Sequence, residues 1–305
     1  MHFNYLHFFV DDLATWRARF TETWGATCLD LAPPLGSTAR TTEVVCLGQV
    51  PLVLSSPTGP GGWQDGYLQH HPPGIGDVAF QVRNLKTTVD RLLSQGGKLL
   101  DPIQTDTDTA LTWCRVLGWG RLRHTLVQPP GPGIWIPGWG NIAPHLPPAG
   151  HRPIRGIDHA VLNVAAGQLQ GAITWYRQQF GFCPRQQFTI DTPNSGLRSQ
   201  VLSHPQGDAQ LPINEPATAN SQVQEFLTWN RGPGIQHVAL QTLDILDTVK
   251  TLKTRGVQFL NVPPSYYQAL NTRPGYSLAK TALEAIARLE ILVDWEPSRP
   301  QACLL

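Results

Sequence analysis

The sequence lacks several features that would mark a specialised class of protein. Charged residues make up only 15% of its 305 residues, and 23 Lys and Arg nearly balance 22 Asp and Glu. A formal net charge of +1 provides no electrostatic attraction for nucleic acid or an anionic membrane surface. No stretch approaches the roughly 18 apolar residues that a membrane-spanning helix needs. We therefore expect neither nucleic acid nor a membrane as a partner.

Cysteine is also scarce: the chain has five, and no two of them form a Cys-x-x-Cys pair. The odd count and wide spacing argue against a disulfide framework or a cysteine-based zinc site. Asp11 and Asp12 interrupt the only early apolar run, and no basic segment precedes it, so we do not expect a secretory signal. These observations indicate a cytoplasmic protein whose cysteines are reduced and buried, with one reactive thiol as the alternative.

The sequence does have enough apolar residues, 41%, to form substantial cores, and its 28 Gly and 27 Pro indicate many turns. A chain of 305 residues usually forms two domains. Residues 128–133 and 147–150 are rich in proline and glycine, which is typical of linkers and loops. We place the boundary near residue 150, so that the predicted domains are 1–150 and 151–305.

The two halves of the chain repeat each other. Gly74–Gln81 aligns with Gly234–Gln241, and an amphipathic helical pattern that ends at glycine follows each segment. Tyr5–Val10 aligns with Ile157–Leu162, again ahead of a helical pattern. Further strands are expected after the later helices, one of them at 257–260. Each half is thus predicted to contain two units of strand, helix and strands, which is an α+β fold.

Two histidines occupy related places in the second half. His159 and His237 each lie in a short apolar run that is typical of a buried strand. Two imidazoles on such strands can bind one metal ion, although each alone is also consistent with a buried structural histidine. In the first half Asp77 takes the place of His237, and His7 aligns with His159. His7 therefore lacks a partner, and we expect a structural or solvent-facing role for it.

Several ordered motifs resemble the 4-hydroxyphenylpyruvate dioxygenase family of the vicinal oxygen chelate superfamily. The resemblance is strongest from Ile154 to Asp294 and rests on Leu211–Pro216, Gly234–Leu240 and Pro263–Tyr267. It implies tandem βαβββ modules in two half-barrel domains, of which the first is a degenerate, non-catalytic copy. It further implies a non-haem Fe(II) enzyme that uses O₂ to convert an aromatic α-keto acid, 4-hydroxyphenylpyruvate, to homogentisate. Decarboxylation and side-chain migration accompany that reaction, which serves tyrosine catabolism or quinone and tocopherol synthesis. Members of the family tend to form homo-oligomers.

The resemblance also assigns site residues. His159 and His237 match the family's two imidazole ligands. The positions that match its substrate pocket are the polar residues Ser199, Asn214, Gln222 and Gln236, with Pro212 and Val161 as apolar walls. Strand alternation predicts that Gln236 points to the face opposite His237. Without the resemblance, Asn214 is equally consistent with a turn residue between two prolines.

The sequence ends at Gln301–Leu305, where the family's late strand should begin. The family's third ligand, a glutamate, is therefore absent from the chain, as are the last strands and the C-terminal helix of the second module, and we expect an open sheet edge. Glu284, Glu290, Asp294 and Glu296 are nearby carboxylates, but a ligand must be placed within tenths of an ångström. A fragment with weak iron binding and little turnover is the simplest interpretation. The alternatives are a 4-hydroxymandelate synthase and a non-catalytic module that binds a small ligand.

Overall fold

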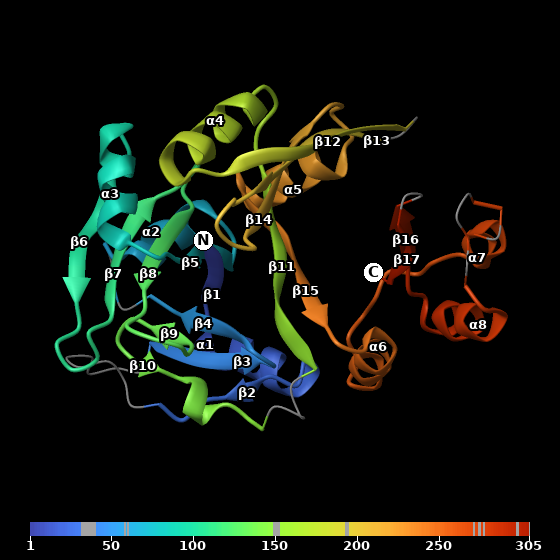
Figure 1. The fold of residues 1–305 in the computed structure, drawn as a ribbon, viewed down its shortest axis with the longest axis horizontal. Helices are drawn as coiled ribbons and strands as arrows, with labels where there is room; N and C mark the ends of the chain where they lie inside the picture. The colour runs from blue at the N-terminus through green and yellow to red at the C-terminus, as the bar shows by residue number, and fades with distance from the viewer. Residues whose placement is uncertain are drawn as a thin grey trace.

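The fold is α+β, as the sequence predicts, and contains two mixed sheets of eight and five strands (Figure 1). The computed structural model describes residues 1–31, 41–57, 59, 61–148, 153–192, 195–270, 272–273, 276, 278–296 and 299–304. None of the helices in these residues has the length and apolar character needed to cross a membrane.

The first sheet has the strand order β2-β3-β4-β1-β5-β8-β7-β6. Its strands are β1 (His2–Phe9), β2 (Thr27–Cys28), β3 (Thr42–Leu47), β4 (Val50–Ser55), β5 (Gly74–Gln81), β6 (Leu99–Thr105), β7 (Thr112–Leu117) and β8 (Arg123–Gln128). The helices of this half are α1 (Leu13–Ala18), a short π-helix (Arg19–Thr23), α2 (Trp63–His70) and α3 (Leu85–Ser94). A small hairpin of β9 (Trp135–Ile136) and β10 (Gly140–Asn141) comes after the sheet, and a 3-10 turn (Ala143–His145) follows it. Strand β1 is central, because it pairs parallel with β4 and antiparallel with β5. Strand β5 in turn pairs parallel with β8.

The second sheet repeats part of this arrangement, with the order β12-β13-β14-β11-β15. Its strands are β11 (Ile154–Asn163), β12 (Cys183–Thr192), β13 (Ser195–Ser203), β14 (Gln210–Pro216) and β15 (Gly234–Thr242), with α4 (Leu169–Phe180) and α5 (Gln222–Asn230) between them. Strand β11 pairs parallel with β14 and antiparallel with β15, as β1 does with β4 and β5. Among the described residues β15 lies at the sheet edge, whereas its counterpart β5 has β8 on its far side. This matches the expected open edge.

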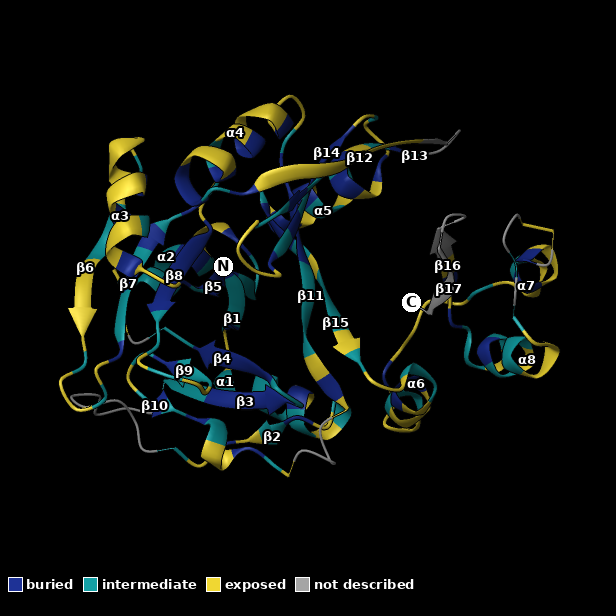
Figure 2. Ribbon diagram, viewed as in Figure 1, coloured by how far each residue is buried: buried dark blue, intermediate teal, exposed yellow. Residues whose placement is uncertain are grey.

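One apolar core joins the two halves, with helices α3 and α4 packed side by side above it (Figures 1 and 2). Helix α4 forms because its apolar residues recur every three or four positions, and it ends at Gly181, whose φ of 78° suits glycine. Its Tyr176 is fully buried, and its hydroxyl lies 2.9 Å from Nε2 of His124 on β8. Each large apolar side chain in this core contributes about 2 kcal/mol through burial.

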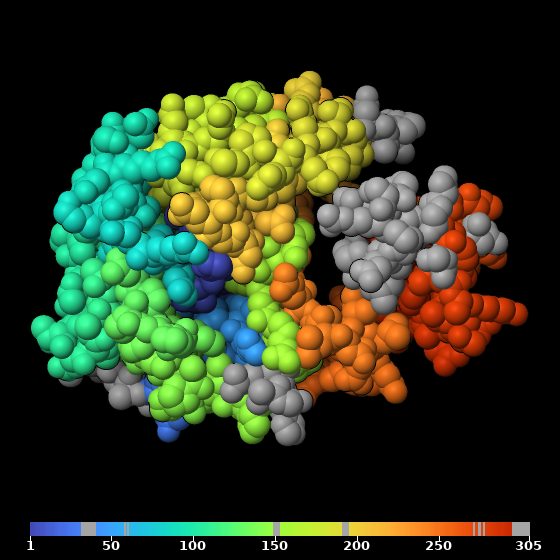
Figure 3. Space-filling view, viewed as in Figure 1, coloured from blue at the N-terminus to red at the C-terminus, as the bar shows by residue number. Residues whose placement is uncertain are grey.

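The C-terminal segment forms a separate lobe, visible in orange and red in Figure 3. It contains α6 (Ile245–Thr254), α7 (Pro264–Leu270), α8 (Lys280–Leu289), β16 (Val293–Glu296) and β17 (Arg299–Leu304). The three helices and Val293 of β16 share their own apolar cluster. The strand predicted at 257–260 is wrong: this segment has no regular structure, and Phe259 and Leu260 are exposed. A strand forms only where a neighbouring strand satisfies its backbone groups, and this segment pairs with none of the described strands.

The cysteine prediction holds only in part. Cys46 and Cys114 are buried, but Cys28 and Cys183 are exposed. Cys183 begins β12, the edge strand of the second sheet, and edge strands leave side chains open to solvent.

Candidate functional site

The structure brings the two predicted histidines together on one face of the second sheet. On the antiparallel pair β11–β15, His159 faces Ala239 and Val161 faces His237. The two histidines are therefore diagonal neighbours whose side chains leave the sheet on the same side. Their ring centroids lie 5.9 Å apart, with an interplanar angle of 76°. Two imidazoles at this separation can approach one small ion between them.

A β-bulge precedes each histidine. The strand register skips Asp158 on β11 and Gln236 on β15, so each is an extra residue with no partner across the ladder. The bulge changes the direction of the extra side chain and brings it to the following histidine. Oδ1 of Asp158 lies 2.7 Å from Nδ1 of His159, and Oε1 of Gln236 lies 3.1 Å from Nδ1 of His237. The prediction that Gln236 points away from His237 is therefore wrong, because alternation fails at a bulge.

These contacts determine which nitrogen of each ring donates a hydrogen bond. Oδ2 of Asp158 also accepts a hydrogen bond of 3.1 Å from Gln241. Although burial opposes it, hydrogen bonds from His159 and Gln241 lower the pKa of Asp158, so its ionised carboxylate can only accept. Nδ1 of His159 must then donate, and Nδ1 of His237 likewise donates to the amide oxygen of Gln236. Burial, followed by the neighbouring His159, lowers the pKa of His237 and favours its neutral form.

In both rings Nε2 is thus the nitrogen that can bind a metal. Metal-binding histidines usually donate their other ring N–H to a carboxylate or carbonyl oxygen, as these two do. Asp158 is the one member of this arrangement that the sequence did not single out.

Four of the predicted pocket residues share the face of the histidines. Ser199 lies opposite Asn214 on β13 and β14, and both are buried. Asn214 in turn lies beside Asn163 of β11, to which its Nδ2 donates a hydrogen bond of 3.3 Å. Pro212 is two residues before Asn214 on the same strand face, and Val161 lies directly opposite His237. The turn interpretation of Asn214 is wrong, since this residue lies within β14.

Other candidates lie elsewhere. Gln222 is exposed as the first residue of α5. Glu290 forms an ion pair of 2.6 Å with Lys253, and Asp294 is on β16 in the C-terminal lobe. The described part of the chain brings no three His, Cys, Asp or Glu side chains into one group that could hold a metal. The donor set that it does provide, two imidazole nitrogens, is one that Fe(II), Zn(II) and Co(II) all accept.

The first half carries a different arrangement at the equivalent position. On β1 and β5, Tyr5 faces Ala79 and His7 faces Asp77, with the register skipping Gly76. Because Asp77 corresponds to His237, the counterpart of His159 is Tyr5. The alignment of His7 with His159 is therefore wrong by two residues, and His7 corresponds to Val161.

A guanidinium group lies between the polar residues of this equivalent position. Nε of Arg123 donates to Oδ2 of Asp77 at 2.7 Å, and one terminal nitrogen lies 3.2 Å from Nδ1 of His7. All three side chains are buried. Burial, followed by the charges of Arg123 and Arg115, holds the pKa of His7 well below its usual value, so His7 is a neutral, buried hydrogen-bonding residue. A side-chain cation thus occupies the region where the second half presents two imidazoles.

Comparison with known proteins identifies the family of the chain. Residues 156–272 match the family described as the Glyoxalase/Bleomycin resistance protein/Dioxygenase superfamily. The chain is 34% identical to the uncharacterized protein slr0090 of Synechocystis sp., over 100% of this chain and 86% of that protein. It is 33% identical to the 4-hydroxyphenylpyruvate dioxygenase of Yarrowia lipolytica, over 86% of this chain and 71% of the relative.

The fold matches a solved mutant structure of 4-hydroxymandelate synthase from Streptomyces coelicolor, with a TM-score of 0.83 and 24% identity over 97% of this chain and 84% of that chain. Sequence and fold lead to one conclusion: the chain belongs to the glyoxalase and dioxygenase superfamily, also called the vicinal oxygen chelate superfamily, as a relative of the 4-hydroxyphenylpyruvate dioxygenases.

Proposed function

We propose that this protein is a non-haem Fe(II), O₂-dependent dioxygenase that converts 4-hydroxyphenylpyruvate to homogentisate. The observation that supports this most is the diagonal pair of His159 and His237, with both Nδ1 atoms engaged and both Nε2 atoms available on one face. The relatives named 4-hydroxyphenylpyruvate dioxygenase provide the substrate class.

His159 and His237 would hold the iron through Nε2. Fe(II) held there would bind the α-keto acid as a chelate and activate O₂. Asp158 holds the proton on Nδ1 of His159 and fixes the orientation of that ring. Because the described residues bring only two imidazoles to the site, we expect weak affinity for iron compared with a site of three protein ligands.

The remaining residues on this face bind and orient the substrate. Ser199 and Asn214 lie opposite each other and present neutral hydrogen-bonding groups, which suit a phenol hydroxyl. Asn163 accepts a hydrogen bond from the Asn214 amide and so fixes which of its atoms face the substrate. Val161 and Pro212 provide apolar surface beside the histidines and exclude water from the ring of the substrate.

A second candidate is hydroxylation of the benzylic carbon, which forms 4-hydroxymandelate. The solved structure whose fold this chain matches is named as a mutant of a 4-hydroxymandelate synthase. A third is a non-catalytic module that binds a small ligand, which is favoured by the absence of a third metal ligand among the described residues.

The test is O₂ uptake with product analysis, using the full chain, excess Fe(II) added anaerobically, and 4-hydroxyphenylpyruvate. His159→Ala and His237→Ala remove one ligand each, and His70→Ala is the matched control because His70 is an exposed residue of α2. We expect homogentisate from the wild type and the control and none from the two ligand variants. Formation of 4-hydroxymandelate instead would show that the benzylic carbon is hydroxylated. No turnover by the iron-loaded wild type, or turnover that persists in His159→Ala, would contradict the proposal.

A further inference from the structure

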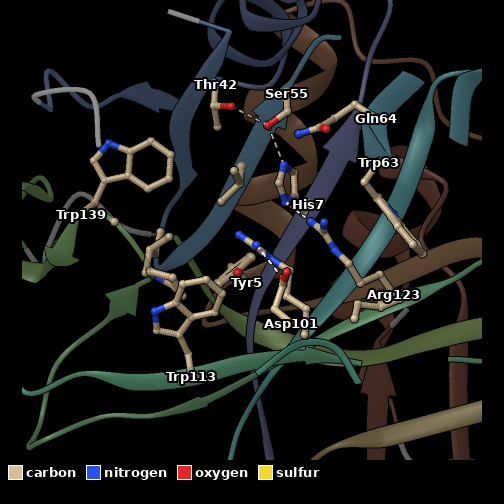
Figure 4. A pocket seen from close by; sticks show the side chains of 16 residues that line it. Tyr5, His7, Thr42, Ser55, Trp63, Gln64, Asp101, Trp113, Arg123 and Trp139 are labelled. Atoms are coloured by element: carbon tan, nitrogen blue, oxygen red, sulfur yellow. Dashed lines mark hydrogen bonds and ion pairs between the residues drawn. The ribbon is translucent and has the colours of Figure 1, made fainter. Parts of the chain in front are cut away.

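A cavity lies within the first half, over the guanidinium group of Arg123 (Figure 4). Its volume is about 490 Å³, which falls in the range of small-molecule sites. Three tryptophans, Trp63, Trp113 and Trp139, contribute to its walls. Residues of β1, β3, β4, β6, β7 and β8 also line it, so the cavity rests mainly on the sheet, and helix α2 and the turn at 137–139 complete its walls. The histidine pair on β11 and β15 is not part of it.

A directed chain of hydrogen bonds crosses one wall of the cavity. A guanidinium can only donate, so Nδ1 of His7 accepts from Arg123 at 3.2 Å. Nε2 of the neutral His7 then donates to Oγ of Ser55 at 2.7 Å. The hydroxyl of Ser55 lies 2.8 Å from that of Thr42, and either hydroxyl can donate to the other. The chain therefore links the guanidinium of Arg123 to the hydroxyl of Thr42.

Two donors in the cavity walls lack an acceptor. Nε1 of Trp63 and Nε of Arg115 are buried and have no hydrogen-bond partner among the described residues. Buried polar atoms are nearly always paired, so an unpaired donor in a cavity wall indicates a missing acceptor. These two groups create a demand for acceptor oxygens inside the cavity.

The unpaired donor of Arg115 favours a carboxylate as the acceptor. Two guanidinium groups, Arg115 and Arg123, line the cavity, and each is in an ion pair, with Asp101 and Asp77 respectively. The Nε–H of Arg115, unpaired among the described residues, can donate a charge-assisted hydrogen bond to a ligand carboxylate. Arg115 lies 2.9 Å from Asp101, and its guanidinium carbon is 4.6 Å from the ring centroid of Trp113. Asp77, which pairs with Arg123, is fully buried, and its Oδ1 already accepts from the backbone of Thr125. The aromatic walls suit a planar ring, because tryptophan faces stack on aromatic ligands.

We propose that this cavity binds an aromatic carboxylate, with the carboxylate at Arg115 and Trp63 and the ring among the tryptophans. This site is separate from the histidine pair and does not depend on the function proposed for that pair. It gives the first half a ligand-binding role in place of the metal site that its Asp77 and Tyr5 cannot form.

The test uses two probes of nearly the same shape, 4-hydroxyphenylacetate and its neutral amide, 4-hydroxyphenylacetamide. The protein is the full chain with His159→Ala and His237→Ala, so that binding at the histidine pair is removed. Binding is measured by calorimetry and by quenching of tryptophan fluorescence. Arg115→Met and Trp63→Phe remove the two unpaired donors, and Trp63→Phe keeps an aromatic ring. Arg17→Met is the matched control, because Arg17 forms a comparable ion pair with Glu43 away from the cavity walls.

We expect the acid to bind saturably, and the amide to bind at least about tenfold more weakly, since a charge-assisted hydrogen bond is lost. Arg115→Met and Trp63→Phe should each weaken binding of the acid by about tenfold, while Arg17→Met leaves it unchanged. Circular dichroism establishes that each variant is folded. The proposal is overturned if the folded protein shows no saturable binding of the acid up to about 10 mM. It is also overturned if the amide binds as tightly as the acid, or if both cavity variants bind like the control.

Discussion

Asp158 should determine how tightly the histidine pair holds a metal ion. Its carboxylate accepts the Nδ1 proton of His159 at 2.7 Å, and the Asp158→Ala substitution removes this acceptor while both imidazoles remain. Removing such an outer partner of a metal ligand typically lowers metal affinity by about 10- to 100-fold. The side chains of His159 and Asp158 are 30% and 39% exposed, so solvent screens part of the interaction. We therefore expect the lower end, about tenfold or about 1.4 kcal/mol.

The assay is calorimetric titration of the metal-free protein with Co(II), which has no redox chemistry under these conditions and accepts imidazole ligands. Asp208→Ala is the control, because Asp208 also contacts a histidine, lying 2.8 Å from His2 in an exposed pair. It should leave the affinity for Co(II) unchanged. An Asp158→Ala protein that binds Co(II) as tightly as the wild type would refute the argument that the bulge positions a partner for the metal ligand.

Three further predictions concern stability, each measured by urea denaturation. Arg123→Met leaves the buried carboxylate of Asp77 unpaired and should destabilise the fold by about 3–5 kcal/mol; a loss below about 1 kcal/mol would contradict a buried ion pair. Gly76→Ala should lower the free energy of unfolding by about 1–3 kcal/mol, because the added Cβ would lie 2.2 Å from the buried ring of Phe9. Gly66→Ala, on helix α2, meets open space and should raise the free energy of unfolding by up to about 1 kcal/mol. Equal effects of the two substitutions would contradict this expectation. Burial lowers the pKa of His124 to about 4. The unfolded chain binds this proton near pH 6.5, so His124 alone should lower the free energy of unfolding by about 3 kcal/mol between pH 6.5 and 4. A free energy of unfolding that does not change over this pH range would argue against a neutral, buried His124.

The repeat in the sequence, together with the family motifs, predicted that His159 and His237 can meet, and the structure places their rings 5.9 Å apart. Both lie on strands with strong apolar patterns, and the common motif places them at related positions in one sheet. Ser199 and Asn214 were expected at the site only from the resemblance to the family, since residue pattern alone left Asn214 equally consistent with a turn. The structure shows why they lie on the face of the histidines: they are partners on neighbouring strands, and strand alternation directs both to that side.

The bulges could not be predicted in this way. A bulge depends on how two strands pair, and nothing local distinguishes Asp158 or Gln236 from other strand residues. The same limit explains the alignment of His7 with His159: identity of residue type suggested it, and only the pairing of His7 with Asp77 revealed the shift. The segment 257–260 has the composition of a strand, but none of the described strands pairs with it. Its composition therefore led to a wrong prediction.

The most direct test of the metal site is the iron content of the protein after anaerobic equilibrium dialysis against Fe(II). The wild type, His159→Ala and His237→Ala are compared at the same free iron concentration, with Asp208→Ala as the control. The account predicts that the wild type and the control bind about one Fe(II) per chain at saturation and that either ligand variant loses it, as expected for one ion held by both imidazoles. Iron binding that survives in either ligand variant, or a wild type that binds none at saturating Fe(II), would contradict it.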